Sequence, residues 1–215
     1  MKIAQGGISW ICSSSLLVVF FVVVSLIVSG PVKSIFIILS FLLFIISCAL
    51  VIFFRDPKRV TGEGVVAVAD GVIREITEEE DADVGKCRKI STFMNIHNVH
   101  VNRMPLDGTI VDIVHYNGSH IPAYKKESER NERVVITIIS DIGLVKVIQI
   151  AGTLARRIVP YISKGDKVYK GDKIGIIRLG SRVDIYLPLQ KIQTVSVSVT
   201  DKVKAGEDSI ARLHD

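Results

Sequence analysis

Four short stretches of the sequence contain residue types that could carry out chemistry: Asp70 in Ala69-Asp70-Gly71, the pair His97 and His100, the pair Arg156 and Arg157, and Ser181 directly after Gly180. A serine hydroxyl is a weak nucleophile that needs a nearby base, and that base needs a third group to orient it. Histidine is a natural base because its imidazole titrates near neutral pH. These residue types make the four stretches candidates for chemistry.

Each of these stretches also has an ordinary structural explanation. Asp-Gly and Gly-Ser pairs are common in turns, and His100 could be a buried histidine whose hydrogen bonds are satisfied. The sequence contains neither His-Glu-x-x-His nor paired Cys-x-x-Cys, so we expect no metal site. It also lacks the Gly-x-Ser-x-Gly motif of many hydrolases. Taken one at a time, the four stretches leave the function open.

Residues 1–54 differ sharply from the rest of the chain, because Lys2 and Lys33 are their only charged side chains. Two long apolar runs, residues 8–28 and 35–54, are separated by the break at residues 29–34. An apolar helix of about 20 residues crosses the hydrocarbon core of a bilayer. We therefore expect a transmembrane helical hairpin in residues 1–54, followed by a separate domain in residues 55–215.

The charges beside the two apolar runs predict the orientation of the hairpin. Lys2 precedes the first run, and Arg55, Lys58 and Arg59 follow the second, whereas the connecting turn holds a single lysine. Basic residues are enriched on the cytoplasmic side of membrane helices. We therefore expect a multi-pass protein of the cell membrane whose large domain lies on the cytoplasmic side.

The remainder of the chain is expected to be mainly β, with a barrel or sandwich architecture. Apolar, β-branched runs recur between turn signals, which is typical of strands: residues 65–69, 133–139, 144–152, 173–179, 182–188 and 194–199. The acidic run Glu78–Asp83 is interpreted as a solvated loop. The 27 basic and 22 acidic residues form no basic stripe with interleaved aromatic residues, so we expect no nucleic-acid partner.

A short repeat offers an alternative function. Lys164-Gly-Asp-Lys-Val and Lys170-Gly-Asp-Lys-Ile predict two similar hairpin turns, a pattern shared with biotinyl and lipoyl carrier modules. A membrane-tethered carrier-like module without enzymatic activity is therefore the second hypothesis. Such a module needs an exposed lysine in a setting such as Met-Lys-Met, which this sequence lacks.

Taken together, the motifs resemble one family in their order and spacing, the phosphatidylserine decarboxylases of the short prokaryotic class. The matching segments cover nearly all of residues 53–190: Phe53-Phe-Arg-Asp-Pro57, Ala69-Asp-Gly71, Val99-His-Val-Asn-Arg-Met-Pro105, Asn131-Glu-Arg-Val134, Gln149-Ile-Ala-Gly152, Ala155-Arg-Arg-Ile158, Lys170-Gly-Asp-Lys-Ile-Gly175 and Leu179-Gly-Ser-Arg-Val-Asp184. Each motif is weak alone, but the ordered set is specific. Relatives with His-x-x-His differ from this chain, which has His100-x-x-Arg103.

The resemblance implies a proenzyme that cuts itself between Gly180 and Ser181. The serine oxygen attacks the Gly180 carbonyl, and later elimination and hydrolysis leave a pyruvoyl group on the new N-terminus. The expected products are a large chain, residues 1–180, and a small pyruvoyl chain, residues 181–215, which stay together as a heterodimer. A homo-oligomer of that heterodimer would be compatible with the resemblance.

The resemblance also implies roles for individual residues. His100 is expected to act as the base and Asp70 as its orienting partner, while Arg103 could bind the substrate phosphate or carboxylate, or pair with a neighbouring acid. The expected reaction removes carbon dioxide from a serine phospholipid and leaves the ethanolamine phospholipid. Diacyl phosphatidylserine and ether-linked archaetidylserine have the same head group, so the sequence leaves the lipid backbone open.

Overall fold

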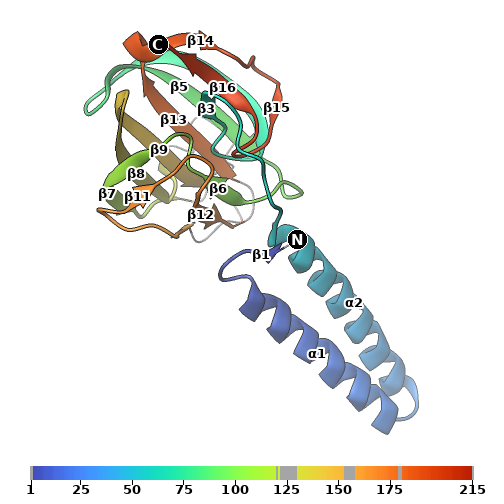
Figure 1. Cartoon of the computed structure of the whole chain (residues 1–215). Coiled ribbons are helices and arrows are strands. Elements are labelled where there is room, and N and C mark those ends of the chain that lie inside the picture. Colours follow the sequence, from blue (N-terminus) through green and yellow to red (C-terminus); the bar gives the residue numbers. More distant parts are fainter. Residues whose placement is uncertain (1, 120, 122–129, 153–157, 179–180, 215) are drawn as a thin grey trace. The chain divides into compact units, whose positions relative to one another are not determined.

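The chain is mainly β-structure preceded by two apolar helices, which confirms the predicted fold class (Figure 1). The structure is a computed structural model that describes residues 2–119, 121, 130–152, 158–178 and 181–214. It divides into two compact units, Met1–Lys58 and Arg59–Asp215. Each unit has its own architecture.

The first unit is a helical hairpin, formed by α1 (Ile8–Ile27) and α2 (Pro31–Phe53). Helix α2 begins at Pro31, earlier than the predicted start at Ile35, because proline is favoured in the first turn of a helix, where its missing N–H costs no hydrogen bond. The break predicted at residues 29–34 is correspondingly shorter. Two short strands, β1 (Lys2–Ile3) and β2 (Arg55–Asp56), pair at the ends of the hairpin.

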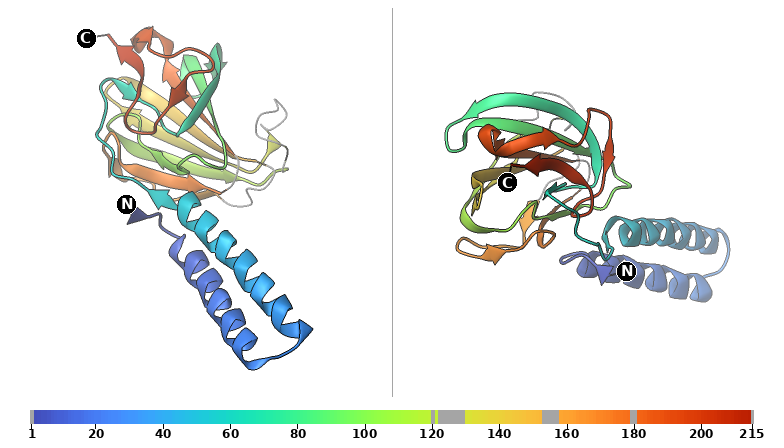
Figure 2. Two further views of the ribbon diagram at one scale, coloured as in Figure 1. Left: turned by 90° about the vertical axis from the view of Figure 1, so that its right-hand side faces the viewer. Right: turned by 45° about the horizontal axis from the view of Figure 1, so that its top comes forward.

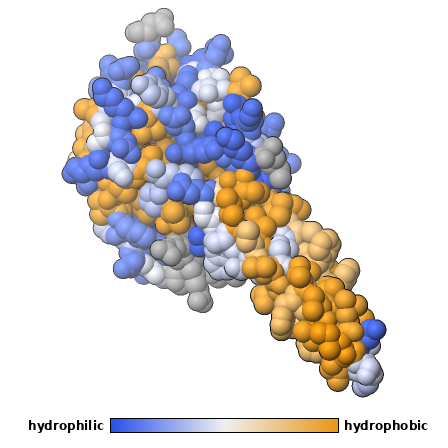
Figure 3. Space-filling model, turned by 60° about the horizontal axis from the view of Figure 1, so that its bottom comes forward, coloured by the Kyte–Doolittle hydropathy of each residue, from blue (hydrophilic) through white to orange (hydrophobic). Residues whose placement is uncertain are grey.

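Both helices are long and apolar enough to cross a membrane. The face of the hairpin that Figure 3 shows is mostly hydrophobic, with polar patches toward its tip, whereas the β-rich unit has a mixed surface. The hydroxyls of Ser14 and Ser47 form a hydrogen bond of 2.9 Å between the helices. A hydroxyl pair of this kind links two helices where neither can hydrogen-bond to lipid.

The second unit is built from short and medium-length strands: β3 (Val65–Val66), β4 (Gly71–Asp81), β5 (Gly85–Met94), β6 (Val101–Arg103), β7 (Gly108–Tyr116), β8 (Arg133–Ser140), β9 (Gly143–Ala151), β10 (Ile158–Pro160), β11 (Lys167–Val168), β12 (Lys173–Ile177), β13 (Ser181–Pro188), β14 (Ile192–Val195), β15 (Lys202–Val203) and β16 (Ser209–Leu213). A 3₁₀ turn at Leu189–Lys191 connects β13 to β14.

Among the described residues, eight of these strands form one antiparallel sheet in the order β11-β7-β8-β9-β13-β5-β4-β15. The sheet curls into a half-barrel (Figure 2). Two smaller sheets, β10-β12-β6 and β14-β16-β3, complete the unit. Strand β13 therefore lies in the interior of the large sheet, between β9 and β5.

The two faces of β13 have different surroundings because side chains alternate along a strand. Val183, Ile185 and Leu187 belong to the hydrophobic core. Arg182 and Asp184 alternate with them and lie on the other face, where they are also buried. Ser181 shares its face with the core residues.

The prediction that Glu78–Asp83 forms a loop is wrong for most of its length, because β4 continues to Asp81. Basic residues of β5 lie opposite these carboxylates and offset their charge. Glu78 pairs with Arg88 at 2.7 Å, and Glu79 pairs with Lys89 at 3.2 Å. Opposite charges across antiparallel strands stabilise such pairs. The sequence of the acidic run does not contain these basic partners, so the run alone could not predict a strand.

Candidate active site

Ser181 is the first residue of β13, and its side chain is completely buried. It lies directly opposite Met94 in β5 and Ala151 in β9. The Ser181 hydroxyl donates a hydrogen bond to the sulfur of Met94 at 3.2 Å. Gly180, the other half of the predicted cleavage site, lies outside the described residues, as do Arg156 and Arg157.

His100 is also completely buried, directly before β6. Its Nδ1 lies 2.9 Å from the backbone carbonyl oxygen of Asn98. A proton on Nδ1 donates to this carbonyl and leaves the lone pair on Nε2, as a general base requires. Asn98 in turn closes the preceding turn, because its side-chain oxygen accepts a hydrogen bond from the amide of Asn95 at 2.8 Å.

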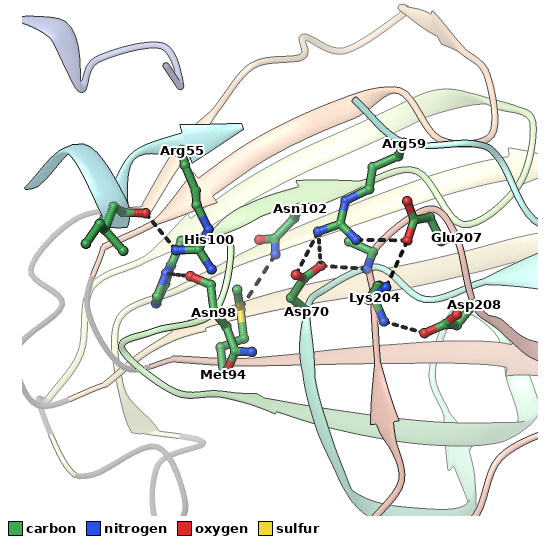
Figure 4. Close-up of polar contacts among 12 residues, drawn as sticks. Arg55, Arg59, Asp70, Met94, Asn98, His100, Asn102, Lys204, Glu207 and Asp208 are labelled. Atoms are coloured by element: carbon green, nitrogen blue, oxygen red, sulfur yellow. Dashed lines mark hydrogen bonds and ion pairs between the residues drawn. The ribbon is translucent and has the colours of Figure 1, made fainter. Parts of the chain in front are cut away.

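The buried carboxylate of Asp70 has different partners from those predicted (Figure 4). Arg59 Nη2 lies 3.0 and 2.8 Å from its two oxygens, and the amide of Ala205 donates to Oδ1 at 2.8 Å. Arg59 also contacts Glu207 at 3.2 Å. The contacts described for Asp70 are thus with Arg59 and the Ala205 backbone, and its orienting role toward His100 stays a prediction.

Arg103 ends β6, and most of its side chain is buried. Its Nη1 donates a hydrogen bond to the carbonyl of Gly171 at 2.9 Å. Gly206 has a φ of +76°, and a Cβ there would lie 2.8 Å from the Arg103 side chain, so a glycine is required for the close approach. Arg103 lines a cavity of about 450 Å³ together with Lys167, Lys173 and two acidic residues, Asp166 and Asp172. The lining therefore carries a small excess of positive charge.

Three further buried residues near Ser181 were not predicted as site residues. Asn102 donates from Nδ2 to the sulfur of Met94 at 3.7 Å, and Gln149 donates from Nε2 to the side-chain oxygen of Asn102 at 2.6 Å. The contact between Asn102 and Met94 is drawn in Figure 4. Gln149 could have been noticed as an amide within the apolar run of residues 144–152, since buried amides are uncommon and need partners.

His100 and Asn102 are both completely buried, and Figure 4 shows them in the same close-up. Asn102 and Ser181 reach the same sulfur atom. The hydrogen bonds therefore join Ser181, Met94, Asn102 and Gln149 into one buried network.

The opposite face of β13 carries a buried charge cluster. Arg182 pairs with Asp184 at 2.8 Å, and Lys89 pairs with Glu79. Burial raises the pKa of the Asp184 carboxyl, although Arg182 acts in the opposite direction. Burial alone would lower the pKa of Lys89, but nearby Tyr186, Asp184 and Glu79 raise it above its usual range. This cluster lies along the face of β13 that is opposite to the face of Ser181.

Comparison with known proteins identifies the family. The model of the family described as phosphatidylserine decarboxylase matches residues 47–211. A phosphatidylserine decarboxylase proenzyme of Streptomyces avermitilis is 50% identical over 161 residues, which cover 74% of this chain and 72% of the relative.

Archaeal relatives match as well. A protein of Methanosarcina mazei assigned as an archaetidylserine decarboxylase proenzyme is 37% identical over 220 residues, covering 98% of this chain and 97% of the relative. A similarly assigned protein of Methanococcoides burtonii is 45% identical over 163 residues, covering 74% of this chain and 73% of the relative. The chain therefore belongs to the phosphatidylserine decarboxylase family of carboxy-lyases.

Proposed function

We propose that this chain is a self-processing proenzyme that cuts its backbone between Gly180 and Ser181 and then decarboxylates a serine phospholipid with a pyruvoyl group on residue 181. The observation that carries the proposal is the position of Ser181, whose fully buried hydroxyl begins an interior strand beside polar side chains. The relatives named above are proenzymes, which supports processing.

In this proposal His100 is the general base. Its Nε2 takes the proton from the Ser181 hydroxyl as the oxygen attacks the preceding carbonyl carbon. The carbonyl of Asn98 holds the Nδ1 proton and so keeps the imidazole in the tautomer that this step needs. The same imidazole can return a proton during turnover, because a histidine can act as both base and acid.

The surroundings of Ser181 fit a pyruvoyl group. Residue 181 is fully buried. The cavity lined by Arg103 does not include Ser181 among its lining residues, and we propose it as the place for the anionic head group. A pyruvoyl group supplies the electron sink for the carbon that loses carbon dioxide. Arg103 would hold the phosphate or carboxylate of the substrate by charge-assisted hydrogen bonds.

The two chains are proposed to remain together as a heterodimer after cleavage. The small chain contributes β13 between β9 and β5, and it also contributes β15 beside β4. Removing it would expose the hydrogen-bonding edges of two strands in the middle of the sheet, which is costly. Asp70 adds a further link, because it joins Arg59 of the large chain to Ala205 of the small chain.

We further propose that α1 and α2 anchor the enzyme in the membrane that contains its substrate, with residues 59–215 on the cytoplasmic side. The helices support the anchor, and the basic residues that follow α2 support the orientation. Protease protection in sealed vesicles of known orientation would show cleavage of the β-rich unit from the cytoplasmic face alone.

The proposed function is tested with Ser181→Ala and Ser181→Cys in the full chain in detergent. Ser181→Ala should remain a single chain without decarboxylase activity, whereas Ser181→Cys should cut slowly, because a thiol is also a nucleophile. Release of carbon dioxide from diacyl phosphatidylserine and from archaetidylserine would identify the lipid. Full activity of Ser181→Ala would contradict the proposal.

A further inference from the structure

The hydroxyl of Ser181 is held by an unusual partner, the thioether of Met94. The distance from Oγ to the sulfur is 3.2 Å, and both side chains are fully buried. The two residues lie directly opposite each other on β13 and β5. Side chains at such positions stand about 5 Å apart at Cβ and interact directly. Register alone therefore brings the sulfur to the hydroxyl.

The position of this sulfur is fixed by two amides. Gln149 donates to the side-chain oxygen of Asn102, so the amide nitrogen of Asn102 lies on the other side, where it donates to Met94. Asn102 lies on β6 and Gln149 on β9, so the network joins two sheets. Gly175 leaves the necessary room, because a Cβ at that position would lie 3.1 Å from the Gln149 amide nitrogen.

This network lowers the stability of the folded state. Asn102 and Gln149 are completely buried, and within the described part of the chain Gln149 Oε1 has no hydrogen-bond partner. Sulfur is a weak acceptor, so the Asn102 donor is only partly compensated. A buried amide without a full set of partners destabilises a core that apolar side chains could fill. Costs of this kind concentrate where a function requires them.

A thioether suits a residue that changes its chemistry. A thioether is a weak acceptor and not a base, so the hydrogen of the Ser181 hydroxyl can leave the Met94 sulfur and turn to His100 when cleavage begins. After conversion to pyruvoyl, the CH₂OH of residue 181 becomes a methyl group, against which a soft, polarisable sulfur packs well. A carboxylate or amide oxygen in this place would lose the Ser181 donor and keep only that of Asn102.

We infer that Met94 is a positioning residue, held by Asn102 and Gln149, that orients the Ser181 hydroxyl for self-cleavage. The inference rests on the proposed self-cleavage at Ser181 and adds the residues that prepare it. It requires the sulfur itself, and not merely the volume of the side chain.

The protein contains a matched control, because Met104 is equally buried in the hydrophobic core. Met94→Leu should slow the appearance of the small chain roughly tenfold, which corresponds to ~1.4 kcal/mol in the barrier, whereas Met104→Leu should cut at the wild-type rate. Met104→Leu grown with selenomethionine should also cut normally, because selenium preserves the acceptor at position 94. Gln149→Leu should slow cleavage in the same direction as Met94→Leu.

Thermal unfolding of uncut chains, measured in the Ser181→Ala background, separates positioning from packing. Met94→Leu and Met104→Leu should shift the midpoint by similar amounts. Wild-type cleavage in Met94→Leu, or equal slowing in both leucine variants, would overturn the inference. If the variant with the single substitution Ser181→Ala still cuts itself, the proposed function is refuted instead. If Ser181→Ala stays uncut while Met94→Leu cuts normally, only the role of Met94 fails.

Discussion

Arg59 and Asp70 form a buried ion pair in which one guanidinium nitrogen lies 3.0 and 2.8 Å from the two carboxylate oxygens. The pair lies between the large and small chains expected from cleavage, since Ala205 donates to the same carboxylate. This arrangement gives Asp70 a structural task beside the orienting role predicted for it.

Asp70→Asn and Arg59→Gln separate the two tasks. Both substitutions break the buried pair and should lower the free energy of unfolding by roughly 3 kcal/mol, measured by urea denaturation in the Ser181→Ala background. In the Ser181 chain, Asp70→Asn should slow self-cleavage by at least about tenfold more than Arg59→Gln, because it also removes the carboxylate predicted to orient His100. Equal cleavage rates in the two variants would reduce Asp70 to a link between the chains.

His100→Ala should slow self-cleavage by ~10²–10⁴-fold, the usual contribution of general acid–base assistance. A time course of small-chain formation measures this effect. His97→Ala and His115→Ala serve as controls and should process almost normally: His97 lies in an exposed turn, and His115 contacts Glu132 at 3.0 Å. Wild-type cleavage in His100→Ala would remove His100 as the base.

Arg103→Ala should cut itself normally but lose most of its decarboxylase activity. The reason is that the guanidinium lines the cavity proposed for the head group, while Ser181 and His100 remain in place. Arg103→Lys should recover only part of the activity, because lysine lacks the planar fork that binds phosphate or carboxylate bidentately. The decisive comparison is carbon dioxide release per cleaved chain; unchanged release in Arg103→Ala would exclude substrate binding by this residue.

The buried Asp184 predicts a pH-dependent difference between the wild type and Asp184→Asn. Burial raises the pKa of this carboxyl in the folded state above its ordinary value of 3.8. The folded protein therefore holds the proton more tightly than the unfolded chain, so this group lowers stability as the pH rises above 3.8 toward the folded pKa. Urea midpoints from pH 3.5 upward should show Asp184→Asn gaining stability relative to the wild type. A difference that is independent of pH would contradict the assignment.

Much of the architecture could be predicted from the sequence because it depends on local patterns. The length and apolar character of residues 8–28 and 35–54 were enough to predict two helices. The apolar runs at residues 133–139 and 182–188 lie within β8 and β13. The two Lys-Gly-Asp-Lys repeats do form turns, in which Asp166 and Asp172 accept hydrogen bonds from backbone amides. Each of these features depends on neighbours in the chain.

The parts that could not be predicted depend on contacts between distant segments. The strand character of Glu78–Asp81 comes from basic partners on β5, and the partners of Asp70 come from residues 59 and 205. The link from Gln149 through Asn102 and Met94 to Ser181 joins four strands. The sequence shows that these four side chains are polar or contain sulfur. It does not show that the order of the strands in the folded sheets brings them into contact.

Intact mass spectrometry of the purified full-length protein is the most direct test of the central claim. The account predicts two masses, one for a large chain that ends at Gly180 and one for a small chain of residues 181–215 whose N-terminal residue has the mass of a pyruvoyl group. Treatment with a hydrazine reagent should label the small chain at its ketone and leave the large chain unchanged. A single uncut chain with an ordinary Ser181 that nevertheless decarboxylates a serine phospholipid would contradict the account.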